Sequence, residues 1–450
     1  MTAPARTAAF QALRSTLAGR TDLPAALAHS RARLSDDRDR SLAAEIVTGT
    51  LRWLRSLDHL AAHFARRPIE KIDADVLVIL RLSLYQLLHL DRVPASAVVD
   101  DAVDLVRAAR KQSASGFVNA VLRNTLRQSH QLPLPARPAA ADDRAAALEY
   151  LGITHSHPEW LVARWLDRYG FDAAERWVRF NNETPALTLR ANTLRATRDA
   201  VRAALAERGV ETEPAPFARD GLVVTTGNPL RGPLDGSFVV QDEASQIVPL
   251  AVAPRPGETV LDLCASPGGK ATAMAAAMHD RGRLIASDVR PRRVDLLHET
   301  LRLSGSRCAA VVHVGPAGSL PFAQAFDRVL VDAPCSGLGT IRRDPDIRWR
   351  RHAADLAGLA AAQLDLLLRA ADVVSPGGRL VYATCSSEPE ENDDVVAAFL
   401  ARRTDFEAVD LRGEAPGVPP ELLDKAGRLR TLPFAHRLEA FYAAALRRIA

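Results

Sequence analysis

The C-terminal half of the chain alternates between short apolar runs and helical patterns, and this alternation restricts the fold more than any other feature. Strand-like runs lie at Thr259–Leu263, Arg283–Ser287, Ala310–Val314, Asp327–Val331 and Gly378–Ala383. Helical patterns fill the gaps, notably at Lys270–Met278, Arg292–Ser304 and Ala353–Val374. This order predicts a doubly wound, mostly parallel sheet, which is an α/β fold.

Two cysteines follow consecutive strands of this predicted sheet. The apolar run that ends at Val331 is followed by Asp332 and Cys335, and the next strand ends at Thr384 and Cys385. Strands joined by one helical crossover usually pair as neighbours, and neighbouring strands lie ~4.8 Å apart. Ligands of open α/β sheets bind beyond the carboxyl ends of the strands. We therefore expect both thiols to converge on one pocket, although an ordinary Pro-Cys-Ser-Gly turn is the alternative for Cys335.

The segment LDLCASPGGK, residues 261–270, reads as a strand that enters a Gly-Gly turn and opens a helix. Such a turn lets a ligand approach the backbone, and the helix N-terminus offers free N–H groups. A P-loop is excluded because Ala271, and not Ser or Thr, follows Lys270, and GxGxxG is absent. The remaining class is the S-adenosylmethionine-binding sheet, in which an acidic residue at the end of the next strand binds the ribose. Asp288 occupies that place about twenty residues on, unless it is merely an exposed acid.

A thiolate beside a methyl donor suits methylation of a pyrimidine at C5. The thiolate adds to C6 of the ring, C5 becomes nucleophilic and takes the methyl group, and elimination then removes the C5 proton. Asp332 is placed to hydrogen-bond the N3/N4 edge of cytosine and to stabilise the adduct. One cysteine would be the nucleophile and the other would help to release the product, and the spacing leaves open which is which.

The rest of the chain divides into three further segments. Apolar residues spaced three and four apart predict an all-α domain over residues 1–130, whose last helices present either a solvated face or a docking surface. Residues 131–147 are rich in Pro, Ala and charge, which is typical of a linker. Residues 148–235 mix helical and strand patterns and predict a small α+β module, and the α/β sheet domain occupies residues 236–450.

Composition narrows the cellular setting and the partners. The formal net charge of the 450 residues is only +4, but nearly all basic residues are arginines, which suit phosphate and stacked bases. The N-terminus does not resemble a signal peptide, and no run of ~18 apolar residues exists. The four cysteines form no CxxC pair, which argues against a zinc site and a disulfide framework. We expect a cytoplasmic, monomeric protein with reduced thiols, no metal and no membrane contact.

Several segments resemble a known family. LDLCASPGGKA, VDAPCSGLGTIRRDPDIRW and YATCSSEPEEN resemble motifs I, IV and VI of the RNA cytosine-C5 methyltransferases, the Nol/Nop/Sun family. VQDEASQ is similar to that family's entry segment, and VVDDAVDLV and GFVNAVLRN resemble the NusB-like domain of its RsmB (Sun/Fmu) branch. The resemblance spans almost the whole chain. It implies a NusB-like RNA-binding domain over residues 1–130, an RRM-like module over 148–235 and a Rossmann-like catalytic domain over 236–450.

The resemblance also implies roles for single residues. Cys385 would be the nucleophile, Cys335 the release cysteine and Asp332 the third catalytic group. The contacts to S-adenosyl-L-methionine would come from Cys264, Ala265, Ser266, Pro267, Gly268, Gly269, Lys270, Asp288, Arg293 and Asp332. The implied substrate is 16S rRNA, free or early in assembly.

The target base must leave its stack to reach such a pocket, so a single-stranded or loosely structured RNA site is expected. The loop after Cys335 is rich in arginine and could bind the phosphates around that base. Its candidate phosphate ligands are Arg342, Arg343, Arg348 and Arg350. The alternative for this loop is a solvated lid.

The sequence departs from the family pattern at two places. The family usually ends its third strand with an Asp for the adenine amine, but VVHVGPAGSL contains no carboxylate. The usual C-terminal Asp-Gly-Phe-Phe is replaced by residues 439–442, Glu-Ala-Phe-Tyr, which we interpret as structural.

We predict an S-adenosylmethionine-dependent enzyme that forms 5-methylcytosine in 16S rRNA. The alternatives are a tRNA or another rRNA as substrate, and a NusB-like assembly factor with a decayed catalytic site.

Overall fold

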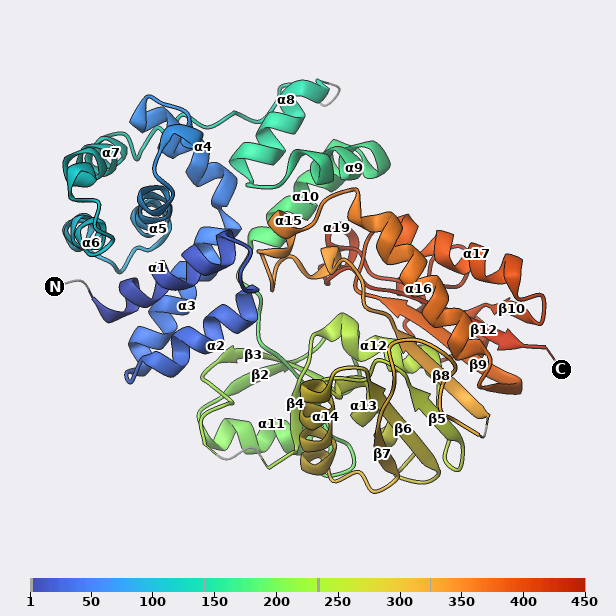
Figure 1. The fold of residues 1–450 in the computed structure, drawn as a ribbon. Coiled ribbons are helices and arrows are strands. Elements are labelled where there is room, and N and C mark those ends of the chain that lie inside the picture. The colour runs from blue at the N-terminus through green and yellow to red at the C-terminus, as the bar shows by residue number, and fades with distance from the viewer. Residues whose placement is uncertain (1–2, 141–142, 233–234, 324, 450) are drawn as a thin grey trace. The chain divides into compact units, whose positions relative to one another are not determined.

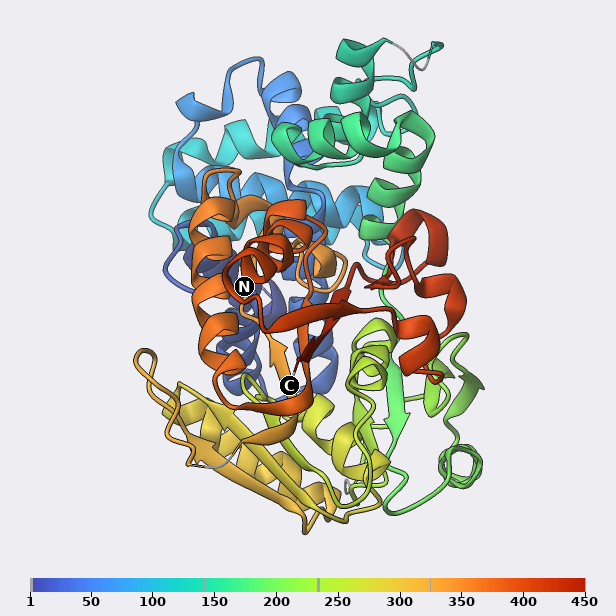
Figure 2. The ribbon, with the colours of Figure 1, turned by 90° about the vertical axis from the view of Figure 1, so that its right-hand side faces the viewer.

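A computed structural model describes residues 3–140, 143–232, 235–323 and 325–449 (Figures 1 and 2). Its contacts define two compact units. Unit 1 comprises Met1–Thr184 and Ile341–Ala353, and unit 2 comprises Pro185–Thr340 and Ala354–Ala450. The chain therefore leaves unit 2 after Thr340, contributes a short segment to unit 1, and returns at Ala354. Within the described ranges, no helix has the length and apolar character needed to span a membrane.

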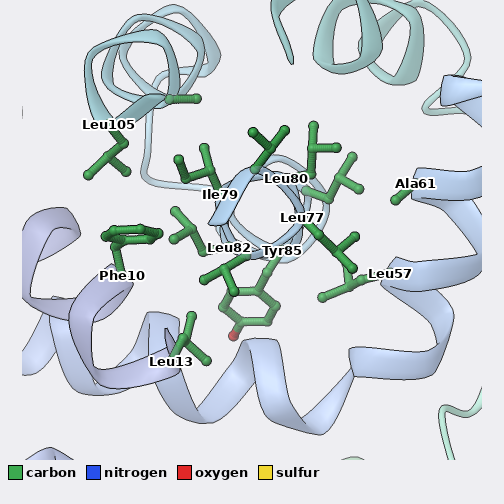
Figure 3. Close-up of a cluster of buried hydrophobic side chains, with 14 of the residues drawn as sticks. Phe10, Leu13, Leu57, Ala61, Leu77, Ile79, Leu80, Leu82, Tyr85 and Leu105 are labelled. Atoms are coloured by element: carbon green, nitrogen blue, oxygen red, sulfur yellow. The ribbon is translucent and has the colours of Figure 1, made fainter. Parts of the chain in front are cut away.

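The first part of unit 1 is a bundle of helices around α5, as the helical periodicity predicted. The long helices are α1 (Pro4–Leu17), α2 (Leu23–Arg33), α3 (Asp37–Arg52), α4 (Leu54–Ala65), α5 (Ala74–His89), α6 (Ala95–Ala108) and α7 (Ser115–Arg127), and the short turns are η1 (Ile69–Lys71) and η2 (Gln112–Ala114). Helix α5 is apolar nearly all round, and its buried side chains face several neighbouring helices (Figure 3). A helix that is apolar on every side is stable only when it is surrounded, which explains its central place.

The second part of unit 1 packs around a pair of tryptophans. It contains α8 (Arg144–Glu149), the turn η3 (Tyr150–Thr154), α9 (Glu159–Tyr169), α10 (Phe171–Asn182) and the returning helix α15 (Ile347–Arg350). The rings of Trp165 and Trp177 are fully buried and stacked, with centroids 4.7 Å apart. The sequence placed α9 and α10 in the α+β module, whereas the contacts group them with unit 1. The residue boundaries of the domains stay predictions.

Unit 2 begins with the small α+β module, in agreement with the prediction. Its sheet has the order β2-β3-β1-β4, and all its pairs are antiparallel. The elements are β1 (Thr188–Ala191), α11 (Arg198–Glu207), β2 (Glu211–Pro214), β3 (Gly221–Thr226) and β4 (Phe238–Val240). Alternate residues of β1 and β3 pack against Val201 and Leu205 of α11, so one helix face covers one face of the sheet.

The larger sheet of unit 2 has the order β10-β12-β9-β8-β5-β6-β7, and β11 pairs with β12. Strands β5 to β9 are parallel, whereas β10 to β12 join antiparallel at one side. The strands are β5 (Thr259–Asp262), β6 (Arg283–Asp288), β7 (Ala309–His313), β8 (Phe326–Asp332), β9 (Val374–Thr384), β10 (Phe406–Val409), β11 (Leu429–Arg430) and β12 (Tyr442–Arg448). The Rossmann-like α/β prediction is therefore confirmed. The sequence LEAFYAAALR, residues 438–447, also predicts a closing strand, and that strand, β12, begins at Tyr442.

Helices cover both faces of this sheet (Figure 1). The helices are α12 (Glu243–Val252), α13 (Gly269–Ala277), α14 (Pro291–Ser304), α16 (Asp355–Ala371) and α17 (Asp393–Arg402), with the short elements η4 (Leu338–Thr340), η5 (Pro389–Glu391), α18 (Leu411–Glu414), η6 (Pro420–Leu422) and α19 (Pro433–His436). Helices α12 to α14 pack with Leu330 and Val381, and α16 and α17 pack with Val329 and Leu380. Successive strand residues face opposite sides, so each apolar strand serves two cores.

Candidate active site

The two site cysteines lie at the carboxyl ends of paired strands. Strands β8 and β9 are parallel, with Asp332 opposite Ala383, and the N–H of Ala333 donates to the carbonyl of Ala383 at 2.9 Å. This register brings the Sγ atoms of Cys335 and Cys385 to 3.2 Å, and both residues are partly exposed. The predicted approach of the two thiols is confirmed, whereas their opening into one shared pocket stays a prediction.

The two sulfurs share a hydrogen bond in which either can be the donor. The hydrogen bond with Cys385, together with burial, raises the pKa of the Cys335 thiol well above its usual range. The thiol form of Cys335 is therefore favoured over its thiolate, and the thiolate form is the nucleophile of cysteine chemistry.

The predicted cofactor loop connects β5 to α13. Gly268, just before α13, has a φ of 108°, and a Cβ there would lie 2.9 Å from Cγ2 of Thr300. Glycine is therefore required both by the backbone conformation and by the close packing. The loop borders a hollow of about 280 Å³. The hollow is lined by Val239, Val240, Gln241, Ser245, Asp262, Cys264, Ala265, Ser266, Pro267, Gly269, Lys270, Thr300 and Asp332.

Lys270 and Asp332 form an ion pair at the inner side of this hollow. Nζ of Lys270 donates to Oδ2 of Asp332 at 2.7 Å, and it lies 5.7 Å from the centroid of the Phe441 ring. Burial alone would lower the pKa of Lys270, but the charge and the hydrogen bond of Asp332 outweigh burial, and the pKa is raised. The predicted cofactor lysine and the predicted catalytic carboxylate are therefore one charged unit.

Asp262, which the sequence analysis did not single out, is the other carboxyl group of the hollow. It is 0% exposed, and neither of its oxygens has a hydrogen-bond partner among the described residues. Burial and the neighbouring charge of Asp332 raise the pKa of Asp262 to about 8. A buried carboxyl group without a donor is costly, and a cationic ligand group would remove that cost. The sequence could have indicated this residue, because Asp262 is the last residue of β5 just as Asp288 is the last residue of β6.

A buried arginine also missed by the sequence analysis holds the start of α13. The side chain of Arg190 on β1 donates to Oγ1 of Thr272 at 2.6 Å, to the carbonyl of Gly269 at 3.2 Å and to Oε1 of Gln241 at 2.8 Å. Burial lowers the pKa of Arg190 to about 10. The small module thus supports the cofactor loop, because its strand carries the cation that fixes the loop's carbonyl and hydroxyl groups.

Asp288 and Arg293 lie at the end of the next strand and are not among the residues that line the hollow. Asp288 is 4% exposed, accepts from the N–H of Arg290 at 3.0 Å, and lies 3.8 Å from Nη1 of Arg293. Its partner in the register of β6 and β7 is His313, whose Nε2 is 3.1 Å from the carbonyl oxygen of Val289. Their predicted ribose and cofactor contacts stay predictions.

The two departures from the family pattern have clear structural settings. Beyond β7, where the expected Asp is missing, Arg369 donates to the carbonyls of Gly315, Pro316 and Gly318 at 3.3, 3.0 and 2.6 Å. At the other departure, the N–H of Ala440 donates to the carbonyl of Gly339 at 3.0 Å, just after the Cys335 loop. The altered C-terminal segment thus packs against the loop that follows Cys335, and its structural role stays a prediction.

The arginine-rich segment belongs to unit 1, and the prediction for Arg348 is wrong. Arg348 is 0% exposed, and its guanidinium donates to the carbonyls of Ser156 and Asn181 at 2.9 and 3.3 Å. The guanidinium N–H groups that would bind a phosphate are therefore already engaged by buried carbonyl oxygens. Arg342 stacks on the ring of Phe180 at 4.0 Å, and Arg350 pairs with Asp346 at 2.7 Å. For Arg342, Arg343 and Arg350 the phosphate contacts stay predictions. Among the residues that the structure describes, no group of His, Cys, Asp or Glu side chains is arranged to hold a metal ion.

Three family profiles match successive parts of the chain. The NusB family matches residues 3–127, the ferredoxin-like domain of RsmF/B-like methyltransferases matches residues 157–231, and the 16S rRNA methyltransferase RsmB/F family matches residues 249–447. The same three regions were distinguished by the sequence patterns. The middle region is described as ferredoxin-like, which agrees with the small α+β module of unit 2.

Curated relatives and solved structures agree with these profiles. The probable ribosomal RNA small subunit methyltransferase B of Bacillus subtilis is 36% identical over 92% of this chain and 91% of its own. The ribosomal RNA small subunit methyltransferase B of Pseudomonas putida is 35% identical over 91% of this chain and 92% of its own. The crystal structure of PH0851 has a TM-score of 0.77 and 25% identity, with 99% of both chains covered. The chain belongs to the RsmB/F family of 16S rRNA methyltransferases.

Proposed function

We propose that this protein methylates C5 of a cytosine in 16S rRNA, with S-adenosyl-L-methionine as the methyl donor and a covalent adduct on Cys385. The observation that carries the proposal is the 3.2 Å approach of two partly exposed thiols at the ends of β8 and β9. Methylation of an exocyclic amine needs no thiol, whereas C5 methylation needs a nucleophile that adds and then leaves. The names of the relatives support ribosomal RNA as the substrate.

The residues of the hollow fit S-adenosylmethionine, which supplies an electrophilic methyl group when it is bound. The unpartnered Asp262 suits the ammonium group of the amino acid moiety, because that group would supply the donors that the carboxyl group lacks. The free N–H groups at the start of α13 suit the carboxylate. Asp288 would bind the ribose, with Arg293 beside it, and the loop from Cys264 to Lys270 would enclose the cofactor.

The site residues then divide the work on the base. Cys385 adds to C6, and Asp332, held by Lys270, hydrogen-bonds the N3/N4 edge of the cytosine and stabilises the adduct. C5 becomes nucleophilic and takes the methyl group. Transfer of the C5 proton to a base then restores the C5–C6 double bond. The C6–S bond breaks in the same elimination, so that Cys385 leaves as a thiolate, and Cys335 assists this release.

The family resemblance implies the order of the two cysteines, with the attack by Cys385 and the release by Cys335. The raised pKa of the Cys335 thiol is consistent with that order, because it disfavours the thiolate form of Cys335.

Bisulfite sequencing of 16S rRNA from cells with and without this protein tests the proposal. We expect one cytosine to lose its methyl group when the gene is deleted, and Cys385→Ala to leave it unmethylated. Cys335→Ala should instead accumulate protein trapped on RNA, visible as a slow-migrating, ribonuclease-sensitive species. Cys308→Ala, at a cysteine outside the site, is the matched control. A Cys335 variant that turns over normally would show that the assigned roles are wrong.

The setting of the reaction is part of the same proposal. We infer that the protein acts in the cytoplasm, as a monomer, on free or early-assembly 16S rRNA. The same sequencing experiment, read on tRNA and 23S rRNA, would reveal a different substrate. Calorimetry with S-adenosylmethionine addresses the assembly-factor alternative, because a decayed catalytic site would bind no cofactor.

A further inference from the structure

We propose that Glu391 is a positioning residue that holds the two thiol-bearing loops together and thereby sets the separation of Cys335 and Cys385. The effect of Glu391 on methyl transfer rests on the proposed function. The hydrogen bonds by which Glu391 holds the two loops are a property of the fold alone. Glu391 lies in η5, just beyond β9, and is 0% exposed. It touches neither sulfur through a hydrogen bond in the described structure, so it acts through other residues.

Both oxygens of the Glu391 side chain are engaged by donors from three different elements. Oε1 accepts from the N–H of Ser336 at 2.7 Å and from Nε2 of Gln363 at 2.9 Å. Oε2 accepts from Oγ of Ser336 and from Oγ of Ser386, both at 2.5 Å. One carboxylate therefore binds the β8 loop, the β9 loop and helix α16 at once.

Ser336 and Ser386 are the residues that directly follow the two cysteines. Their hydroxyl oxygens lie 3.2 Å apart, the same separation as the sulfurs of Cys335 and Cys385. The carboxylate sits against this serine pair, one residue removed from the thiol pair. Because each serine is covalently next to a cysteine, a shift of either serine would move the neighbouring sulfur.

The chemistry of the side chain suits this task. A carboxylate only accepts hydrogen bonds, and its two oxygens have room for the four donors that converge here. No cationic side chain pairs with Glu391 among the described residues, so these donors alone compensate its burial. Hydrogen bonds to a carboxylate are short and strong, and a buried, satisfied network fixes one geometry.

Neighbouring contacts hold Glu391 itself in place. The hydroxyl of Tyr382 donates to the backbone carbonyl of Glu391 at 2.5 Å, and its oxygen lies 3.0 Å from Oε1 of Gln363. The next residue, Asn392, accepts from Oγ1 of Thr384 at 2.5 Å and donates to the carbonyl of Ser386 at 2.9 Å. The polar residues that follow Cys385 in the sequence thus fold back on the loop that carries it.

The proposal predicts a defect in thiol geometry and not in cofactor binding. Misplacing a reacting group by about 1 Å can cost about 100-fold in rate. We expect Glu391→Ala to lower kcat for methyl transfer by about that factor. The KM for S-adenosylmethionine should change by less than about threefold, because Glu391 does not line the hollow. Glu391→Gln keeps the shape and several hydrogen bonds, so it should restore most of the rate.

Cross-linking of the thiols measures their approach without RNA, cofactor or activity. Diamide, an azo oxidant, removes one hydrogen from each thiol, so that an S–S bond forms and the N=N bond becomes a hydrazine. Peptide mapping by mass spectrometry quantifies the Cys335–Cys385 disulfide over time. We expect the rate to fall about tenfold or more in Glu391→Ala, because a disulfide needs closely matched Cβ positions. Asp394→Ala, which removes an exposed carboxylate three residues away, should match the unsubstituted protein.

The outcomes separate the inference from the proposed function. If the unsubstituted protein cross-links rapidly but methylates no cytosine, the proposed function fails and the positioning role stands. If Glu391→Ala cross-links at the normal rate, the positioning role is wrong whatever the enzyme does. Should Glu391→Ala not fold, the double variant Ser336→Ala/Ser386→Ala carries the test, and an unchanged cross-linking rate there overturns the inference. A parallel loss of cofactor affinity in Glu391→Ala would also overturn it, because that indicates general disorder.

Discussion

Two carboxyl groups of unit 2, Glu391 and Asp262, are both 0% exposed, but their surroundings are opposite. Glu391 accepts four hydrogen bonds from protein groups, whereas Asp262 accepts none from the described residues. Asp262 is the last residue of β5 and Glu391 lies beyond β9, so both are near the carboxyl ends of strands, where α/β proteins bind ligands. The difference indicates that the thiol side of the site is completed by the protein itself, whereas the cofactor side is left for a ligand to complete.

The largest expected effect is on the pH dependence of the free energy of unfolding, because burial destabilises the ionised form of Asp262 much more than the protonated form. Its pKa, about 8 in the folded protein, is well above the ordinary value of 3.8, so the folded state binds more protons than the unfolded state between these values. Stability without cofactor should therefore fall as pH rises from about 4 to about 8, by up to about 5 kcal/mol. Urea unfolding across that range should show the decline, and Asp262→Asn should reduce it. An equal decline in Asp262→Asn would remove the contrast with Glu391.

A substitution of Asp262 should also weaken the binding of the cofactor. Asp262→Ala should weaken binding of S-adenosylmethionine by about 100-fold, because the ligand's ammonium group would lose its charged partner. Calorimetry gives the dissociation constant. The matched variant Glu391→Gln should stay within about threefold of the unsubstituted protein. Equal losses in both variants would show that the two carboxyl groups are not divided between two tasks.

Lys270 links the two sides and sharpens the comparison. Lys270→Met removes the partner of Asp332 while it keeps much of the side-chain volume, so methyl transfer should fall about 50-fold. Single-turnover transfer to 16S rRNA measures this loss. The diamide cross-linking rate should not change, because Lys270 makes no hydrogen bond to either thiol loop in the described structure. A slower cross-linking rate would place Lys270 among the groups that position the sulfurs.

The smallest effect concerns a buried charge outside the site. Arg348→Met should destabilise the protein by about 2 kcal/mol, because buried carbonyls in unit 1 lose their donor. Arg350→Met should cost less, about 1 kcal/mol, because the Arg350 side chain is exposed although its partner Asp346 is buried. Thermal unfolding compares the two variants. RNA affinity should fall more in Arg350→Met than in Arg348→Met, and the reverse order would restore Arg348 as a phosphate ligand.

Much of the fold was predictable because its signals are local. The alternation of apolar runs with helical patterns placed β5 to β9 to within a few residues, with β9 starting earliest relative to its prediction. The rule that parallel neighbours present their carboxyl ends together was enough to bring Cys335 to Cys385. The start of the closing strand was less accurate, because residues 438–441 continue the apolar pattern without joining the sheet.

The environment of single charged side chains was not predictable in the same way. Arg348 stands in a run of arginines that reads as an exposed basic loop, yet it is buried against residues more than 150 positions earlier in the chain. Glu391 accepts a hydrogen bond from Ser336, which lies 55 positions earlier, and the sequence around Glu391 does not predict that contact. Burial and partners of this kind depend on which distant segments meet.

The sequence by itself determined the order of the elements, the identity of the reactive groups and the strand ends that carry them, because periodicity and turn residues act over a few neighbours. Only the tertiary structure decided that Glu391 accepts four hydrogen bonds, that Asp262 has no hydrogen-bond partner among the described residues and that Arg348 is enclosed. The physical reason is that the free energy of a buried charge depends on the donors and acceptors around it in space. Those partners come from segments that only folding brings together.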